Sequence, residues 1–218
     1  GPTFPCNCRQ RRLVCGERSP SFILGQTLPT AQPLEEKASP MILTKSLIGF
    51  VIALALTTRA EAAPDPENML YMQLKGGRVV IQLRPDLAPK HVARIKELTR
   101  QKFYDGLVFH RVIDGFMAQG GDPKGTGTGG SGVNLPAEFS SAPFVRGTLG
   151  MARSANPNSA DSQFFICFAP APHLNKQYTV WGQVIEGMEF VDALKRGEPP
   201  SQPDRILTMR VAADVEKQ

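Results

Sequence analysis

The feature that most constrains the fold of this chain is a series of short β-rich runs, which clusters of Gly and Pro separate. The runs occupy residues 70–74, 79–83, 107–113, 117–119, 147–152, 164–168, 180–185 and 206–213. Gly76-Gly77 lies between the first two runs, which predicts a β-hairpin there. Many short strands with few helices favour an all-β sandwich or barrel.

Two segments instead show a helical period. Residues 88–101 predict a helix, because Pro89 suits a first turn and Asp86 is placed to cap it. The apolar residues that recur there at helical spacing are Val92, Ile95 and Leu98. Residues 187–196 have apolar positions three apart and predict a second, shorter helix.

Residues 41–62 have the organisation of a secretory signal peptide. A positive start at Lys45 precedes an apolar run at 47–56 and a small-x-small site at 60–62. The apolar run is about half of the roughly 20 residues that a membrane-spanning helix needs. Cleavage after Ala62 is therefore expected, and an uncleaved helix or membrane anchor is the alternative.

Residues 1–40 stand before this signal, where a signal peptide should begin the protein. Gly1-Pro2 resembles the scar of tag removal, and the rest of the segment has no sustained period. We interpret 1–40 as non-native, or as the product of a start assigned too early with Met41 the true initiator, and expect it to be disordered. The remaining boundaries are a linker at 63–68, a folded domain at 69–214 and a tail at 215–218.

Charge and cysteine usage exclude several classes of function. From Ala63 onward the chain has 18 Lys and Arg against 16 Asp and Glu, scattered without a stripe. This balance does not favour nucleic acid or an anionic membrane as a partner. Cys167 is the lone cysteine after the leader, so no internal disulfide can form there. The histidines are too dispersed for a metal site, and we expect neither a metal nor a cofactor.

The run from Phe109 to Asp122 carries the clearest chemistry. It places Arg111 among apolar side chains, with the amide of Gln119 a few positions on. A second run, residues 162–166, adds another amide and more aromatic rings. Such a set suits a neutral, apolar ligand whose charge distribution must be polarised. It lacks the nucleophile and base that bond-breaking chemistry usually requires.

A glycine-rich stretch matches a nucleotide-binding pattern by composition only. Residues 125–130 satisfy G-x-G-x-x-G, and residues 127–132 satisfy it in a shifted register. A dinucleotide fingerprint must open a helix, whereas Pro136 follows closely here. We interpret the stretch as a flexible glycine loop. His110 is interpreted as a buried or hydrogen-bonded structural residue.

Taken together, the runs around Arg111 and Gln163 resemble the cyclophilin family of peptidyl-prolyl cis–trans isomerases. Further matching pieces are residues 147–152, 156–159 and 180–184. The resemblance extends from about Asn68 to about Ala213. It implies a mainly β fold, namely a closed eight-stranded antiparallel barrel with an α-helix covering each open end.

The resemblance also implies the site. Arg111, Gln119 and Phe116 stand at catalytic positions, with Arg111 directed at the proline nitrogen of the twisted X–Pro bond. Gln119 and Gln163 would hold the peptide on either side of that bond. The family's substrate-binding positions are occupied by Met117, Ala152, Gln163, Phe165 and Leu174.

Three positions depart from many eukaryotic cyclophilins. His173 stands where they have Trp, Arg153 where they have Asn, and Tyr178 where they have His. These differences resemble a bacterial cyclophilin and predict weak cyclosporin binding, with His173 and Tyr178 still bordering the substrate.

We therefore expect an exported, monomeric, cofactor-free isomerase that acts on proline-containing polypeptides in a bacterial periplasm, without stable membrane insertion. A proline-peptide binding module that lacks catalysis and a scaffold using the barrel surface are the alternatives.

Overall fold

A computed structural model describes residues 65–215 of the chain. The leader predicted at 1–40 and the signal peptide predicted at 41–62 lie outside these residues. Within residues 65–215, no helix has both the length and the apolar character that crossing a bilayer requires.

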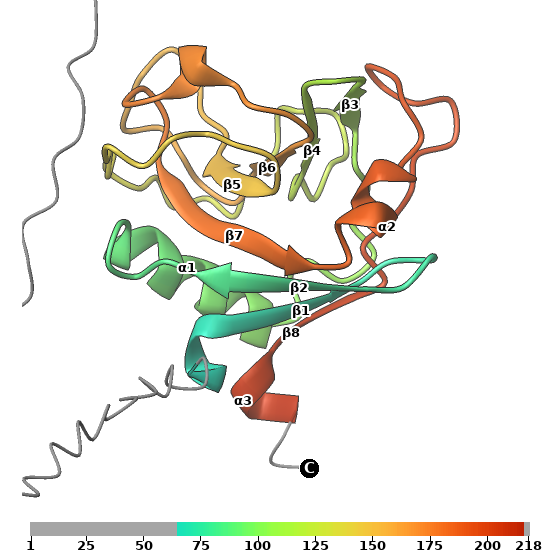
Figure 1. Ribbon diagram of the computed structural model, residues 1–218, viewed down its shortest axis with the longest axis horizontal. Coiled ribbons are helices and arrows are strands. Elements are labelled where there is room, and N and C mark those ends of the chain that lie inside the picture. The colour runs from blue at the N-terminus through green and yellow to red at the C-terminus, as the bar shows by residue number, and fades with distance from the viewer. Residues whose placement is uncertain (1–64, 216–218) are drawn as a thin grey trace, which may run out of the picture. The chain divides into compact units, whose positions relative to one another are not determined.

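The described residues alternate short strands with a few helical segments (Figure 1). The strands are β1 (Met69–Gln73), β2 (Arg78–Leu83), β3 (Arg111–Ile113), β4 (Met117–Gly120), β5 (Thr148–Met151), β6 (Phe164–Cys167), β7 (Val180–Glu186) and β8 (Thr208–Val211). The helical segments are η1 (Pro66–Asn68), α1 (Pro89–Arg100), η2 (Pro172–Leu174), α2 (Met188–Asp192) and α3 (Ala212–Val215). The mainly β class is thus as predicted, and the hairpin β1–β2 turns at Lys75-Gly76.

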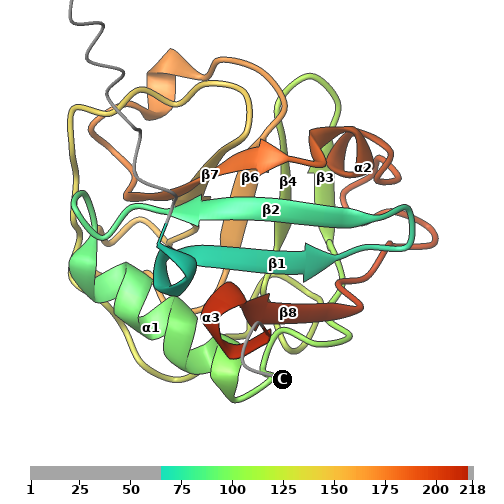
Figure 2. The same cartoon turned by 60° about the horizontal axis from the view of Figure 1, so that its bottom comes forward.

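All eight strands belong to one sheet in the order β3-β4-β6-β5-β7-β2-β1-β8, with antiparallel neighbours throughout. The sheet curls so that β1, β2 and β8 run across β3, β4 and β6 (Figure 2). In the same view α1 and α2 lie on opposite sides of the curled sheet.

The closed barrel predicted from the resemblance is wrong, because the sheet is an open, curled half-barrel. The edge strands β3 and β8 share no ladder. The segments that precede them meet instead through one isolated bridge, between Val108 and Arg205. Loop hydrogen bonds surround it, including Phe109 N–H to the Asp204 carbonyl at 2.9 Å. Backbone N–H and C=O groups in these segments therefore find partners through irregular loop contacts, without a continuous strand pair.

Strand β6 is buried on both faces, and its alternating side chains serve two apolar clusters. Phe164 and Ile166 point into the main core, where the fully buried Trp181 meets the Phe164 ring edge-on at 5.7 Å. Phe165 and Cys167 point the other way, into a smaller cluster with Met117. The sheet therefore has a filled interior and a second, partly covered apolar face.

The first predicted helix is present as α1, with Pro89 at its first position, but its cap is not Asp86. Asp86 instead forms an ion pair with Arg84. The free amides at the helix start donate to the Glu138 carboxylate, at 3.1 Å from both Lys90 N and His91 N. Glu138 Oε2 also lies 2.7 Å from His91 Nδ1. Glu138, far along the chain, thus caps the first amides of α1 in place of a local residue.

The second predicted helix is shorter than expected, because α2 ends at Asp192 rather than near residue 196. Beyond it the Lys195 amide donates to Asp204 Oδ2 at 2.8 Å, and the Gly197 backbone pairs with Val112. These partners draw the chain away from the helix. At the C-terminus, residues 212 and 213, predicted to continue a strand, begin the short helix α3.

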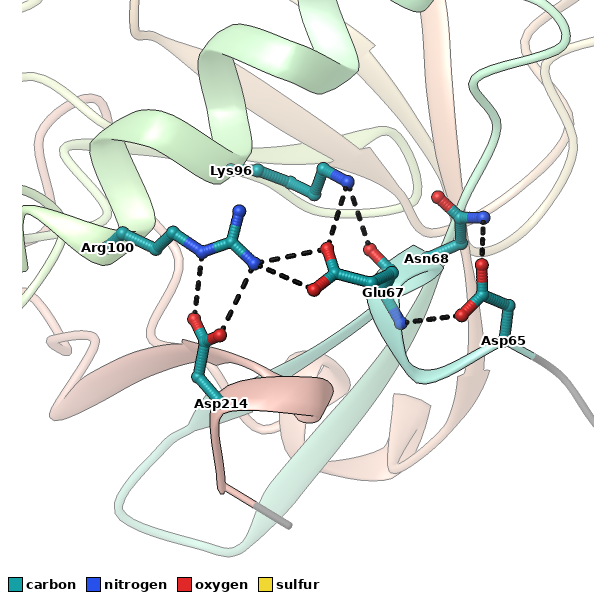
Figure 3. Close-up of polar contacts among 6 residues, drawn as sticks. All are labelled: Asp65, Glu67, Asn68, Lys96, Arg100 and Asp214. Atoms are coloured by element: carbon teal, nitrogen blue, oxygen red, sulfur yellow. Dashed lines mark hydrogen bonds and ion pairs between the residues drawn. The ribbon is translucent and has the colours of Figure 1, made fainter. Parts of the chain in front are cut away.

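An ion-pair network ties both ends of the described chain to α1 (Figure 3). The Arg100 guanidinium contacts Glu67 of η1 at 3.0 Å and Asp214 of α3 at 2.9 Å. Lys96 also contacts Glu67, at 3.3 Å. Residues 65–68, predicted as a polar linker, therefore form a structured turn against the helix, with Asp65 accepting a hydrogen bond from the Glu67 amide.

The Glu138 cap predicts an acid-sensitive contribution to stability. Burial alone would raise the pKa of Glu138, but the hydrogen bonds from the His91 side chain and from the His91 and Lys90 amides together lower it. A carboxyl whose pKa is lower in the folded state stabilises the fold above its unfolded pKa. That contribution is lost as the pH falls through the folded pKa.

We expect Glu138→Ala to lower the free energy of unfolding by about 1–2 kcal/mol at pH 7, and by progressively less towards pH 3. Urea unfolding across this range measures it. Glu97→Gln, on the exposed side of the same helix, is the control and should have little effect. An equal loss for Glu138→Ala at both ends of the range would contradict the cap.

Candidate active site

The register of four neighbouring strands places the key predicted residues in one row. Arg111 of β3 lies opposite Gln119 of β4, and Gln119 lies opposite Phe165 of β6. Phe165 in turn lies opposite Gly150 of β5. Because residues that are directly opposite across antiparallel strands share a face, all four positions lie on the same side of the sheet. The row sets a cation, an amide and an aromatic ring side by side, with the glycine at its end.

A pocket of about 120 Å³ opens beside this row. Eight of the ten predicted site residues line it, together with one that was not predicted to do so, Arg153. The lining residues are Arg111, Phe116, Met117, Gln119, Ala152, Arg153, Phe165, Leu174 and Tyr178. Strands β3, β4 and β6 supply the floor, while η2 and the loops after β5 and η2 supply the walls.

Aromatic contacts fix the floor of this pocket. The Phe165 ring stacks on Phe144 at 5.6 Å and meets Tyr178 edge-on at 5.8 Å. Gly150 makes room for them, because a Cβ at this position would lie 2.6 Å from the Phe144 ring and closer still to the Phe165 ring. The floor is therefore rigid as well as apolar.

Two predicted residues stand at the border of the pocket rather than in its lining. Gln163 Oε1 accepts a hydrogen bond from Gln119 Nε2 at 2.9 Å, and its own amide donates to the Gly127 and Gly129 carbonyls. Gln163 thereby lines an adjoining pocket of about 380 Å³. His173 packs its ring against Phe116 at 5.4 Å.

Arg111 has an acidic partner that the sequence did not reveal. Its Nε donates to Glu198 Oε2 at 2.6 Å, and both side chains are about half exposed. Glu198 follows α2 by several residues and is 87 positions from Arg111 in the chain. No local pattern links two residues at that distance, so only the fold could show the pair.

Arg153 forms a cationic wall between the pockets. Its guanidinium lies over the Tyr178 ring at 4.5 Å and donates to the Gln177 carbonyl at 2.8 Å. It also donates to the Ser154 carbonyl at 2.9 Å. The sequence marked Arg153 only as a departure from eukaryotic relatives. Its position shows that it holds together the two loops that border the pocket.

The glycine-rich stretch is an organised loop around two carboxylates rather than a flexible one. Asp122 is buried and accepts hydrogen bonds from the amides of Lys124, Thr126 and Gly127. Asp161 accepts from the amides of the residues that end the loop, Ser131 and Gly132. The glycines allow this close approach, since a Cβ on either Gly129 or Gly130 would collide with one of these carboxylates. Five amides of this loop are thus already bonded to carboxylates of the protein itself.

Two groups near the site, His110 and Cys167, are poorly suited to act as a base or a nucleophile. Burial lowers the pKa of His110, and the nearby Arg111 adds to the effect while Asp122 opposes it. Both ring nitrogens of His110 are buried without a hydrogen-bond partner. Burial raises the pKa of the Cys167 thiol to about 12. Within residues 65–215, no three His, Cys, Asp or Glu side chains gather as metal ligands.

Comparisons with known proteins agree with this geometry. Residues 69–211 match the family model described as cyclophilin type peptidyl-prolyl cis-trans isomerase/CLD. A probable peptidyl-prolyl cis-trans isomerase of Brucella suis is 52% identical, with 75% of this chain and 93% of that protein covered. Peptidyl-prolyl cis-trans isomerase B of Bacillus subtilis is 45% identical, with 56% of this chain and 87% of that protein covered.

Solved structures show the same likeness. Cyclophilin AquaCyp293 from Hirschia baltica superposes with a TM-score of 0.65 at 29% identity, covering 69% of this chain and 76% of the other. A Cryptosporidium parvum cyclophilin, crystallised in the presence of the dipeptide Ala-Pro, has a TM-score of 0.61 at 29% identity. That match covers 66% of this chain and 98% of the other.

Proposed function

Since the chain belongs to the cyclophilin-type family of peptidyl-prolyl cis–trans isomerases, we propose that Arg111 stabilises the twisted transition state of X–Pro rotation. The observation that carries this proposal is the row of Arg111, Gln119 and Phe165 beside a pocket of about 120 Å³. A proline ring in that pocket would lie against Phe165, with the rotating bond within reach of the cation and the amide.

The chemistry follows from what rotation does to the amide. The X–Pro bond turns slowly because C–N resonance is lost at the twisted state, at a barrier of about 20 kcal/mol. As resonance fails, the proline nitrogen gains a localised lone pair. A donor aimed at that nitrogen binds the twisted state more strongly than either planar state, and this difference accelerates the reaction.

Arg111 suits this task better than an acid or base would. Its guanidinium stays charged and presents N–H donors in a fixed plane. The apolar walls around it strengthen the interaction by lowering the local dielectric. An acceleration from about 10⁻² to about 10³ per second requires roughly 7 kcal/mol. Charge-assisted hydrogen bonds together with orientation can supply this without a covalent step.

The proposed substrates are unfolded or loop segments of exported proteins that contain X–Pro bonds. The pocket and its larger neighbour would give an extended chain room on both sides of a bound proline ring. The family relationship and the Ala-Pro dipeptide of the Cryptosporidium structure support the class of ligand. The signal-like residues 41–62 support a periplasmic location. We further propose that the protein acts as a cofactor-free monomer.

We expect Arg111→Ala to remain folded and to lose about a hundredfold in kcat/KM, because the Arg acts mainly at the transition state. Arg111→Lys should also lose most of its turnover, since an ammonium lacks the planar fork. A protease-coupled proline-peptide assay measures both.

Arg84→Ala is the matched control, because Arg84 is similarly exposed and also paired with a carboxylate but does not line the pocket. It should leave turnover unchanged. Near-normal activity of Arg111→Ala would show that the mechanism is wrong. An unmodified protein that binds proline peptides without accelerating rotation would instead indicate a binding module.

If residues 41–62 are a signal peptide, as we propose, the mature N-terminus is Ala63 or lies within two residues of it. Intact-mass measurement of the protein taken from its native envelope tests this. Recovery of a membrane-bound form that retains residues 41–62 would contradict cleavage.

Cyclosporin should inhibit this protein weakly. His173 stands where Trp-bearing relatives offer a larger ring with an indole N–H donor, and its smaller ring packs on Phe116. Loss of such an anchor costs about 2 kcal/mol, or about thirtyfold in affinity. We expect His173→Trp to recover much of this sensitivity with little change in turnover. Inhibition constants for both forms measure it, and tight inhibition of the unmodified protein would contradict the prediction.

A further inference from the structure

We propose that Glu198 is a positioning residue, which orients the Arg111 guanidinium for the twisted transition state. This inference rests on the role proposed above for Arg111. Glu198 does not line the pocket of about 120 Å³, and its hydrogen bond and ion pair are with Arg111, so we expect it to act through that side chain.

The backbone places Glu198 directly beside Arg111. Gly197 and Val112 exchange two backbone hydrogen bonds of 2.8 Å each, in an antiparallel bridge. In an antiparallel pair, the residue after one partner lies opposite the residue before the other. Glu198 therefore lies opposite Arg111 and extends the row of the site by one position. Opposite charges facing each other across strands attract.

The segment that carries Glu198 is stiff. Gly197 has a φ of 149°, and a Cβ there would lie 2.5 Å from the Pro200 Cα, so the chain turns tightly at this point. Two prolines follow Glu198 and restrict φ at both positions. On the other side of Gly197, the Lys195 amide is bonded to Asp204 at 2.8 Å. A carboxylate on such a backbone can hold a partner in one direction.

Glu198 binds the Nε–H of Arg111, which the proposed chemistry does not need. Glu198 Oε2 accepts from Nε at 2.6 Å, which restrains the plane of the guanidinium. The terminal amino groups are then the donors that can face the pocket. An Arg side chain that is 43% exposed would otherwise sample many rotamers. Because an exposed ion pair contributes little to stability, orientation is the larger effect expected of this pair.

Glu198 could also lower turnover, and a measurement of kcat distinguishes this effect from positioning. Glu198 also reduces the net positive charge beside the pocket. If the charge of Arg111 mattered more than its direction, removal of Glu198 would raise turnover. The two effects therefore differ in the sign of the change in kcat.

The experiment compares Glu198→Ala and Glu198→Gln with the unmodified protein, using NMR exchange and coupled assays on a proline peptide. We expect Glu198→Ala to lower kcat about tenfold, with KM changed less than about twofold, because the apolar pocket still binds the ring. Glu198→Gln keeps an acceptor for Nε and should lose about threefold. The ¹⁵Nε–H signal of Arg111 should exchange faster with water in Glu198→Ala.

Asp114→Asn is the matched control. It removes the carboxylate partner of Arg196 Nε, at 3.0 Å, and Arg196 lies in the same loop as Glu198. It should change neither kcat nor the Arg111 signal. An equal loss of kcat in Asp114→Asn would overturn the proposal, because loop stability would then explain both.

Arg111→Ala separates failure of this inference from failure of the proposed function. If Arg111→Ala is inactive while Glu198→Ala keeps or gains kcat, positioning by Glu198 is wrong and the role of Arg111 stands. If Arg111→Ala is itself fully active, the proposed mechanism fails, and the inference fails with it.

Discussion

The structure depends on burial of both faces of the strands at the centre of the half-barrel. Along β6, Phe164 and Ile166 fill the interior, while Phe165 and Cys167 cover the other face. This alternation sets the register of β4 and β5 against it, because a slip by one residue would exchange the two faces. The same constraint aligns Arg111 with Gln119 and Phe165, so the site is a direct product of how the core packs.

Carboxylate side chains hold several irregular segments in place. Glu138 caps α1, Asp122 and Asp161 hold the glycine-rich loop, and Glu198 pairs with Arg111. In each case a backbone or guanidinium donor that lacks a ladder partner meets a carboxylate, which lies in the same loop for Asp122 and on a distant segment for the others. These carboxylates fix the conformation of the loops. They also occupy backbone amides that local caps or ligands would otherwise use.

Local pattern in the sequence was enough for most of the strands and the main helix, and the family resemblance supplied most of the residues that line the pocket. Period and turn residues mark β1, β2 and α1, and the apolar runs around Arg111 and Phe165 mark the floor of the site. The errors concern contacts between distant segments. The closed barrel, the cap at Asp86 and the length of the second helix each depend on such a contact, and so does the unpredicted Glu198. No periodicity encodes contacts of that kind.

Phe165 has two structural roles, and these limit how ligand recognition can change among related proteins. Its ring is both the floor of the pocket and part of a packed cluster with Phe144 and Tyr178, in a space that Gly150 leaves open. A change at this position would alter ligand recognition and folding at once, so adaptation to new clients has little freedom there. Arg153 lies on a loop beside the pocket and His173 lies in η2, and at both positions a new side chain need not disturb the sheet. Novel preferences can therefore accumulate around a centre that stays the same.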